Sequence, residues 1–128
     1  MTAKEMTLLG LIGFGIWLSG AVGYHFCGTL LFESGPAVLA LVALGMALSV
    51  CFLLRATMDW RKLPAAQSAS VALIMTLSGL FGDVAYVLNF SALTGLKAAT
   101  AGPFAAVLMF ATAVLYAYAL VRAARAKG

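Results

Sequence analysis

The sequence predicts an all-α membrane protein in which four transmembrane helices form an antiparallel bundle and both termini lie in the cytoplasm. Three observations support this fold class. First, 64% of the 128 residues are apolar and 9% are charged, whereas a soluble domain keeps roughly 25% of its residues charged. Second, four apolar runs are each long enough to cross a bilayer. Third, lysine and arginine gather at one side of these runs. We expect one domain over residues 1–128, because no long hydrophilic segment separates the runs.

The four apolar runs define the expected helices. A bilayer core of about 30 Å needs about 20 mostly apolar residues in a helix. Backbone groups in lipid must bond within the protein, so only helices or closed barrels can span. The apolar residues here are continuous rather than alternating, which favours helices. The expected helices cover residues 7–32, 36–54, 68–93 and 103–121.

Three polar breaks separate the expected helices. Residues 33–36 (ESGP) predict a tight turn, since glycine tolerates unusual backbone angles and proline suits the first turn of the next helix. Residues 55–67 form the longest polar loop, in which Trp60 is expected to anchor at the headgroup interface. Residues 94–102 are rich in small side chains and precede Pro103.

The basic residues predict how the chain is threaded. One side of the expected bundle carries Lys4, Arg55, Arg61, Lys62, Arg122, Arg125 and Lys127. The other side carries Lys97 alone. Loops rich in lysine and arginine stay cytoplasmic, so both termini are expected inside, in the inner membrane of a bacterium. The basic C-terminal tail would meet anionic lipid headgroups, and the positive net charge therefore requires no nucleic-acid partner.

The first run has an alternative interpretation as a cleaved signal peptide. Ser19, Gly20 and Ala21 follow an apolar stretch and provide the small residues of a cleavage site. Against cleavage, Glu5 neutralises the positive charge of Lys4, and the apolar run continues far beyond this position. We therefore expect the first run to remain as a helix.

Small residues recur on the expected helices. A ridge on the first helix repeats every fourth residue and consists of Gly15, Ser19, Gly23 and Cys27. Shorter rows occur on the second helix at Ala43, Ala47 and Cys51, and on the third at Ser78 and Gly82. Membrane helices associate closely along such ridges, so they fit either packing within the bundle or a dimer seam. Because the two cysteines lie at different depths, we expect no disulfide, and their spacing to His25 predicts no metal site.

Polar residues deep in two helices predict an intramembrane cluster. His25 lies about 12 Å and Asp83 about 15 Å below the expected outer boundary, at 1.5 Å per residue. Ionisable residues in a membrane face the bundle interior and find partners there. We therefore expect a cluster of His25, Asp83 and Asn89. Further hydrogen bonds could come from Tyr24 and Tyr86 at similar height and from Glu33 at the outer lip.

The sequence favours a helix-packing or accessory membrane subunit, with a transporter or channel as the alternative, so three roles are considered for this cluster. It could hold helices together, at about 0.6–2 kcal/mol per interhelical hydrogen bond. It could form a proton- or cation-linked site in a small, possibly dimeric, transporter or channel, since intramembrane Asp and His mark ion pathways. It could instead belong to an accessory subunit that contacts a partner membrane protein. We expect no enzyme activity and no cofactor, because no catalytic, phosphate-binding or nucleotide-binding motif occurs.

Three segments resemble an uncharacterised family of small bacterial four-helix inner-membrane proteins. They are residues 17–28 (WLSGAVGYHFCG), 77–90 (LSGLFGDVAYVLNF) and 101–120 (AGPFAAVLMFATAVLYAYAL). The chain departs from the family pattern at His25, where arginine is more usual, and at Ser78, where proline is expected. The resemblance implies the four-helix fold and carries no activity. Small multidrug-resistance transporters are similar in length and number of spans, but they rely on a carboxylate in the first helix, where this chain has His25.

Overall fold

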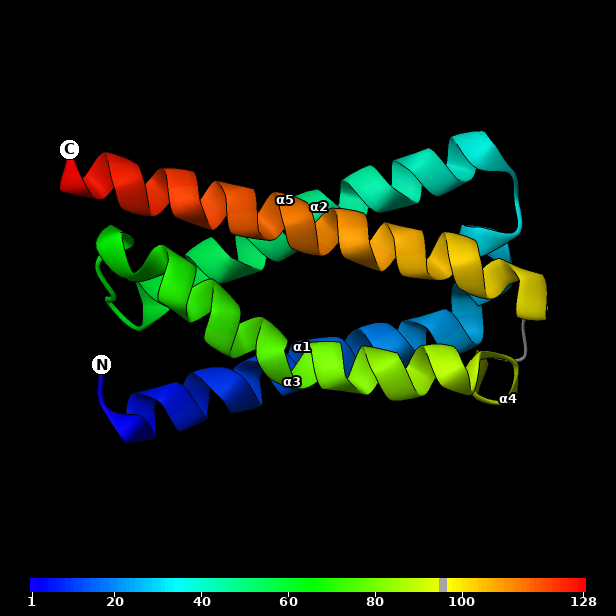
Figure 1. Ribbon diagram of the computed structural model, residues 1–128, viewed down its shortest axis with the longest axis horizontal. Coiled ribbons are helices and arrows are strands. Elements are labelled where there is room, and N and C mark those ends of the chain that lie inside the picture. The colour runs from blue at the N-terminus through cyan, green and yellow to red at the C-terminus, as the bar shows by residue number, and fades with distance from the viewer. Residues whose placement is uncertain (95–96) are drawn as a thin grey trace.

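The computed structural model describes residues 1–94 and 97–128, and within these ranges the chain is almost entirely helical, without strands. Four long helices run antiparallel (Figure 1). They are α1 (Ala3–Phe32), α2 (Pro36–Trp60), α3 (Ser68–Leu88) and α5 (Ala101–Lys127). Three short elements lie between them: η1 (Ala65–Gln67), α4 (Phe90–Thr94) and η2 (Ala98–Thr100).

The four long helices have the length and composition of membrane spans, which confirms the expected fold class. Their outward faces carry large apolar side chains, including Phe26 and Leu88, each 79% exposed, and Met109, 73% exposed. Lipid is the solvent in which such a surface is stable. Both termini lie at the same end of the bundle, together with the connection from α2 to α3 (Figure 1).

Several helix ends differ from those expected. The helix α2 continues to Trp60 and α5 to Lys127, because hydropathy marks only the bilayer-crossing part of a helix whose backbone bonding continues beyond it. The expected third helix ends at Leu88 rather than residue 93, and α4 follows as a separate short helix. The turn at residues 33–36 is confirmed, with φ of 114° at Gly35 and proline at the first helical position.

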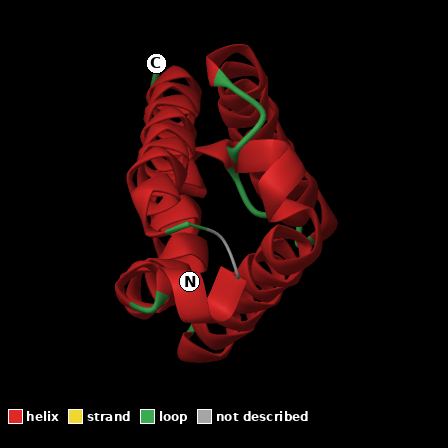
Figure 2. Cartoon of the chain, turned by 90° about the vertical axis from the view of Figure 1, so that its right-hand side faces the viewer, coloured by secondary structure: helices red, strands yellow, loops and turns green. Residues whose placement is uncertain are grey.

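The main packing partners of α1 and α2 are not the helices next to them in sequence. The helix α1 packs chiefly on α3, α2 packs on α5, and α3 packs on α5, whereas α1 and α2 touch little despite their tight turn. Figure 2 views the bundle nearly end-on, from the end that carries this turn and α4. The bundle therefore has three well-packed seams and one loosely packed side, between α1 and α2.

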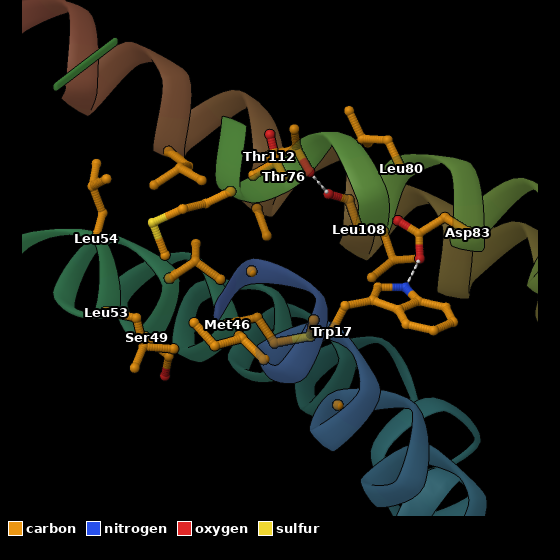
Figure 3. A pocket seen from close by; sticks show the side chains of 18 of the residues that line it. Trp17, Met46, Ser49, Leu53, Leu54, Thr76, Leu80, Asp83, Leu108 and Thr112 are labelled. Carbon is orange, nitrogen blue, oxygen red and sulfur yellow. Dashed lines mark hydrogen bonds between the residues drawn. The ribbon is translucent and has the colours of Figure 1, made fainter. Parts of the chain in front are cut away.

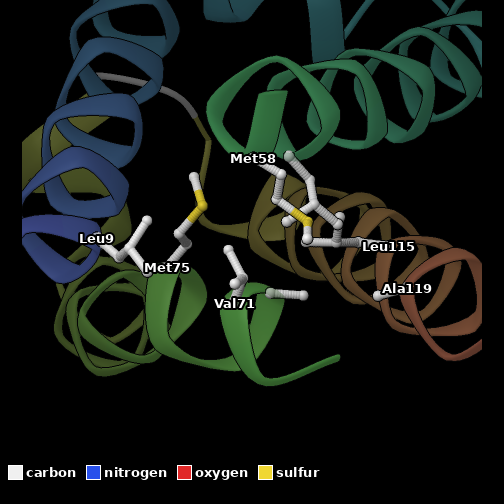
Figure 4. Packing of buried hydrophobic residues seen from close by; sticks show 8 residues of the cluster. Leu9, Met58, Val71, Met75, Leu115 and Ala119 are labelled. Atoms are coloured by element: carbon white, nitrogen blue, oxygen red, sulfur yellow. The ribbon is translucent and has the colours of Figure 1, made fainter. Parts of the chain in front are cut away.

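Two buried clusters form the core. The cluster at the end that carries the termini consists of Leu9, Leu54, Met58, Val71, Ala72, Met75, Leu115 and Ala119 (Figure 4). The second is largely aromatic and consists of Phe32, Tyr86, Phe90, Phe104 and Val107. In it, Phe104 meets the rings of Tyr24 and Phe32 edge-on at centroid distances of 5.1 Å, a geometry that aromatic pairs favour.

Ion pairs tie together the loops at the end that carries the termini. Arg61 donates two hydrogen bonds to Glu5, from Nε to Oε1 at 2.9 Å and from Nη2 to Oε2 at 2.8 Å. These hydrogen bonds raise the pKa of Arg61, so its guanidinium stays charged. Asp59 at the end of α2 pairs with Arg122 of α5 at 3.6 Å. The start of α1 is thus joined to the α2–α3 connection, and the end of α5 to the end of α2.

Candidate functional site

A half-open cavity of about 510 Å³ lies between the four long helices, next to the first core cluster (Figure 3). Side chains of all four long helices line it, and most are apolar, such as Ile16, Leu54 and Leu108. In the part of the chain that the structure describes, Asp83 is the only charged residue in this lining. The site is therefore a carboxylate in the wall of an apolar chamber.

Asp83 is held by a tryptophan of α1. The indole Nε1 of Trp17 donates to Oδ1 of Asp83 at 2.7 Å (Figure 3). The ring lies against Gly79 and Gly82, where a Cβ atom would come within 3.1 Å and 2.6 Å, respectively, of ring carbons. These glycines and Asp83 share one face of α3, since residues three and four apart are neighbours on a helix. The indole therefore fits only because α3 has no side chains there.

A second cavity, of about 620 Å³, lies between α3 and α5. It shares Leu80, Asp83, Leu108 and Thr112 with the first cavity. Among the described residues, none bonds the second carboxylate oxygen of Asp83, Oδ2. Asp83 thus lies between the two cavities. Its Oδ1 is held by Trp17, and its Oδ2 accepts no hydrogen bond from the described residues.

A hydroxyl pair crosses the same wall. The side chains of Thr76 on α3 and Tyr116 on α5 share a short hydrogen bond. Thr76 lines the first cavity and Tyr116 the second. Thr76 and Asp83 are seven residues apart on α3, hence two turns along one face. The α3–α5 seam therefore carries two separate polar sites, the hydroxyl pair and the carboxylate, two helical turns apart.

The structure does not bring His25 to Asp83. His25 is exposed and donates from Nδ1 to the carbonyl oxygen of Leu93 in α4 at 3.0 Å. It lies eight residues beyond Trp17, about 12 Å further along α1 at 1.5 Å per residue. The expectation assumed that the turn after α1 and the end of the third helix lie at one height. Because α3 ends early and α4 follows, the residue of α1 opposite Asp83 is Trp17.

The other members of the expected cluster bind elsewhere. The side-chain amide of Asn89, just after α3, donates to the Ala85 carbonyl of α3 at 2.9 Å. The hydroxyl of Tyr86 donates to the Ala21 carbonyl at 3.3 Å, and that of Tyr24 to the sulfur of Met46 at 3.3 Å. Tyr24 also lines the first cavity. Of the expected cluster, Asp83 and Tyr24 therefore belong to the site.

Glu33, expected at the outer lip, joins the end of α1 to the start of η2 and α5. Its Oε1 accepts hydrogen bonds from the backbone amide of Lys97 at 3.2 Å and from the hydroxyl of Thr100 at 2.9 Å. The carboxylate thus satisfies donors near the beginning of a helix, where negative charge is favoured. Its hydrogen bonds close the end of the bundle that lies opposite the termini.

The small-residue ridge of α1 does not pack within the chain. A Cβ added at Gly15 or Gly23 would have nothing within 4 Å, and Ser19 and Cys27 are exposed. The face of α1 that meets α3 instead contains Gly13, whose added Cβ would overlap the carbonyl of Met75, and Trp17. Gly15 lies about 200° around the helix from Gly13, at about 100° per residue. Seating Trp17 against α3 therefore turns the ridge away from α3.

The row on the second helix does pack within the chain, as one of the two sequence interpretations proposed. Ala47 is 1% exposed, while Ala43 and Cys51 pack against the two core clusters. Cys51 and Cys27 are both free thiols. Within the described residues, no group of three or more His, Cys, Asp or Glu side chains could hold a metal ion.

Sequence reasoning missed Trp17 and Gly13. Trp17 lies within an apolar run and Gly13 is one of 13 glycines, so neither stands out in the sequence. A usable signal was present on α3, where Gly79 and Gly82 open a gap next to the carboxylate of Asp83. Such a gap admits a large flat side chain that has a hydrogen-bond donor, and the indole of tryptophan has both properties.

Comparison with known proteins assigns a family but no activity. A family model described as "Family of unknown function (DUF5367)" matches residues 31–126, and the chain belongs to this family. The matched range contains α3 with Asp83 and all but the last residue of α5. The segment at residues 17–28, which includes Trp17, lies outside it. No curated protein and no solved structure matches the chain.

Proposed function

We propose that this member of the DUF5367 family is a small membrane transporter or channel that binds a cation or a proton at Asp83. The observation that carries the proposal is the position of Asp83 in the wall shared by two cavities. A charged side chain in a bilayer is costly, by about 2.5–3.5 kcal/mol on insertion scales for Asp at a helix centre. The hydrogen bond from Trp17 offsets part of this cost for one oxygen. The second oxygen, Oδ2, has no hydrogen-bond donor among the described residues, so Asp83 can bind a ligand as well as join α1 to α3.

Ion flux into liposomes tests this function. Vesicles containing the wild-type protein should dissipate an imposed proton, sodium or potassium gradient faster than empty vesicles, and Asp83→Asn should abolish the difference. The asparagine keeps an acceptor for Trp17, so the fold should survive. Asp59→Asn is the matched control, because Asp59 is an exposed carboxylate at the end of α2. Equal flux through wild-type and Asp83→Asn protein would contradict the role of Asp83.

The proposed threading places both termini in the cytoplasm of a bacterial cell, with the chain in the inner membrane. The common location of the termini and the α2–α3 connection supports it, because that end carries all but one of the lysines and arginines. A fluorescent-protein fusion at Gly128 should therefore fluoresce, and a phosphatase fusion after Lys97 should be active outside. A phosphatase that is active at Gly128 would reverse the threading.

A second candidate function is that of a subunit that contacts another transmembrane helix. The exposed ridge at Gly15, Ser19, Gly23 and Cys27 supports it, because close helix packing in lipid uses such surfaces. A second copy and a different membrane protein are both compatible with the ridge. In a Cys51→Ala background, Cys27 can be oxidised in native membranes. If the partner is a second copy, the product should be a disulfide-linked dimer with the mass of two chains. A larger adduct would indicate another protein, and no adduct would argue against the ridge.

A further inference from the structure

The chemistry of the two cavities narrows the kind of ligand that Asp83 can bind. Hard metal cations such as Mg²⁺ and Ca²⁺ take six or more oxygen ligands. Besides the carboxylate of Asp83 and the phenol of Tyr24, the first cavity offers four hydroxyls, those of Ser19, Ser49, Thr76 and Thr112, one from each long helix. The remaining lining is mostly apolar. This is a poor cage for a bare metal ion.

The same surroundings suit an organic cation. A cavity of about 510 Å³ lies within the range of about 300–1,000 Å³ that holds drug-sized ligands. An apolar body would cover the leucine, isoleucine and methionine side chains, while one positive charge faces Oδ2 of Asp83. The rings of Trp17 and Tyr24 also line this cavity, and aromatic faces attract cations.

The second cavity gives such a ligand a path from the lipid. Its lining includes Val84, Leu88 and Met109, which are 61%, 79% and 73% exposed on the outer surface of the bundle. It reaches Asp83 through the four residues that it shares with the first cavity. A molecule dissolved in the bilayer could therefore meet the carboxylate between α3 and α5 without first crossing water.

We propose that the ligand of this site is a hydrophobic organic cation that reaches Asp83 from the bilayer through the α3–α5 groove and fills the inner cavity. This inference rests on the proposed function and specifies its substrate class. The charge of Asp83 selects the cation, and the apolar lining selects its body. Leu80 and Leu108, which border both cavities, stand between the groove and the inner chamber.

The fluorescence of Trp17 allows a direct binding test. The chain has two tryptophans, and Trp60 is 67% exposed at the end of α2. Trp60→Phe therefore leaves Trp17 as the only tryptophan, at the site itself, and its emission can be excited selectively over that of tyrosine. Tetraphenylphosphonium and tetraphenylborate serve as probes, since they have nearly the same shape and opposite charge. The phosphonium should change the fluorescence saturably, and the borate should not.

Variants at Asp83 separate charge recognition from folding. In the Trp60→Phe background, Asp83→Asn should weaken phosphonium binding at least tenfold, and Asp83→Glu should retain more of the affinity than Asp83→Asn. Unfolding curves should show that the asparagine variant remains folded. Equal binding of both probes, or unchanged affinity after Asp83→Asn, would overturn the inference.

A matched pair of variants tests the proposed route from the bilayer through the second cavity. Ala113 lines the second cavity only, while Ala106 is exposed on the same helix and lines neither cavity. Ala113→Phe should slow phosphonium association several-fold, and Ala106→Phe should leave it unchanged. Equal association rates for the two variants would overturn the route between α3 and α5.

The ligand class and the proposed function can fail separately. Asp83-dependent proton or alkali-ion flux in liposomes, without phosphonium binding, would overturn the ligand class and leave the function standing. Asp83-dependent binding without uptake of the phosphonium, and without ion flux, would support the ligand site and contradict transport.

Discussion

Replacing Trp17 with alanine should destabilise the bundle by about 3–5 kcal/mol, the range for truncating a large aromatic side chain in a core. The indole fills the gap over Gly79 and Gly82, and its ring stacks on Phe14 at a centroid distance of 5.8 Å. Its removal would also leave Asp83 without its hydrogen-bond donor in an apolar environment. The free energy of unfolding can be measured by denaturant titration in mixed micelles.

Two further variants test the same prediction. Trp17→Phe keeps most of the ring and removes the N–H group, so its cost should be smaller, about 1–3 kcal/mol, the penalty of leaving a buried polar group unpaired. Trp60→Ala is the matched tryptophan control at an exposed position and should cost less than about 1 kcal/mol. Equal losses at the two tryptophans would mean that Trp17 is not a core contact.

Gly13→Ala should separate α1 from α3. A Cβ atom at this position would overlap the backbone carbonyl of Met75, and backbone cannot rotate away as a flexible side chain can. Overpacking of this kind costs about 1–3 kcal/mol and occasionally more, and here the helix itself must move. The displaced α1 would pull Trp17 from Asp83, so we expect a loss of stability together with a shift in Trp17 emission.

Gly15→Ala provides the control for that substitution. The two glycines are two residues apart on one helix, and an added Cβ at Gly15 meets nothing within 4 Å. Alanine has higher helix propensity than glycine by about 1 kcal/mol, so Gly15→Ala should be neutral or slightly stabilising in the isolated chain. If Gly13→Ala were equally mild, the close contact with Met75 would be wrong.

The turn at residues 33–36 was predictable because its determinants are local. Gly35 adopts the positive φ that glycine tolerates, and proline begins the next helix. The number of helices was predictable for a similar reason, since the hydropathy of each run depends only on its own residues. The end of α3 at Leu88 was not predictable in this way, because the apolar run continues through α4 without a clear break.

The candidate site was predicted in part. Asp83 was identified because a carboxylate deep in an apolar run requires a partner. The partner was assigned incorrectly to His25, since counting residues from the turns gives no information on how far two helices slide along each other. The hydrogen bond from Trp17 and the contact of Leu93 with His25 show the offset that the structure adopts.

The sequence alone therefore determined that four helices are apolar enough to cross a membrane. It also determined that one of them carries a carboxylate whose burial costs free energy. These properties depend on the hydropathy and backbone bonding of individual segments. Only the tertiary structure decided which face of each helix is inside. The ridge at Gly15 has the composition of a packing surface, yet α1 turns Gly13 and Trp17 toward α3. The reason is steric: the indole fits where Gly79 and Gly82 leave space, and that contact joins residues more than sixty positions apart.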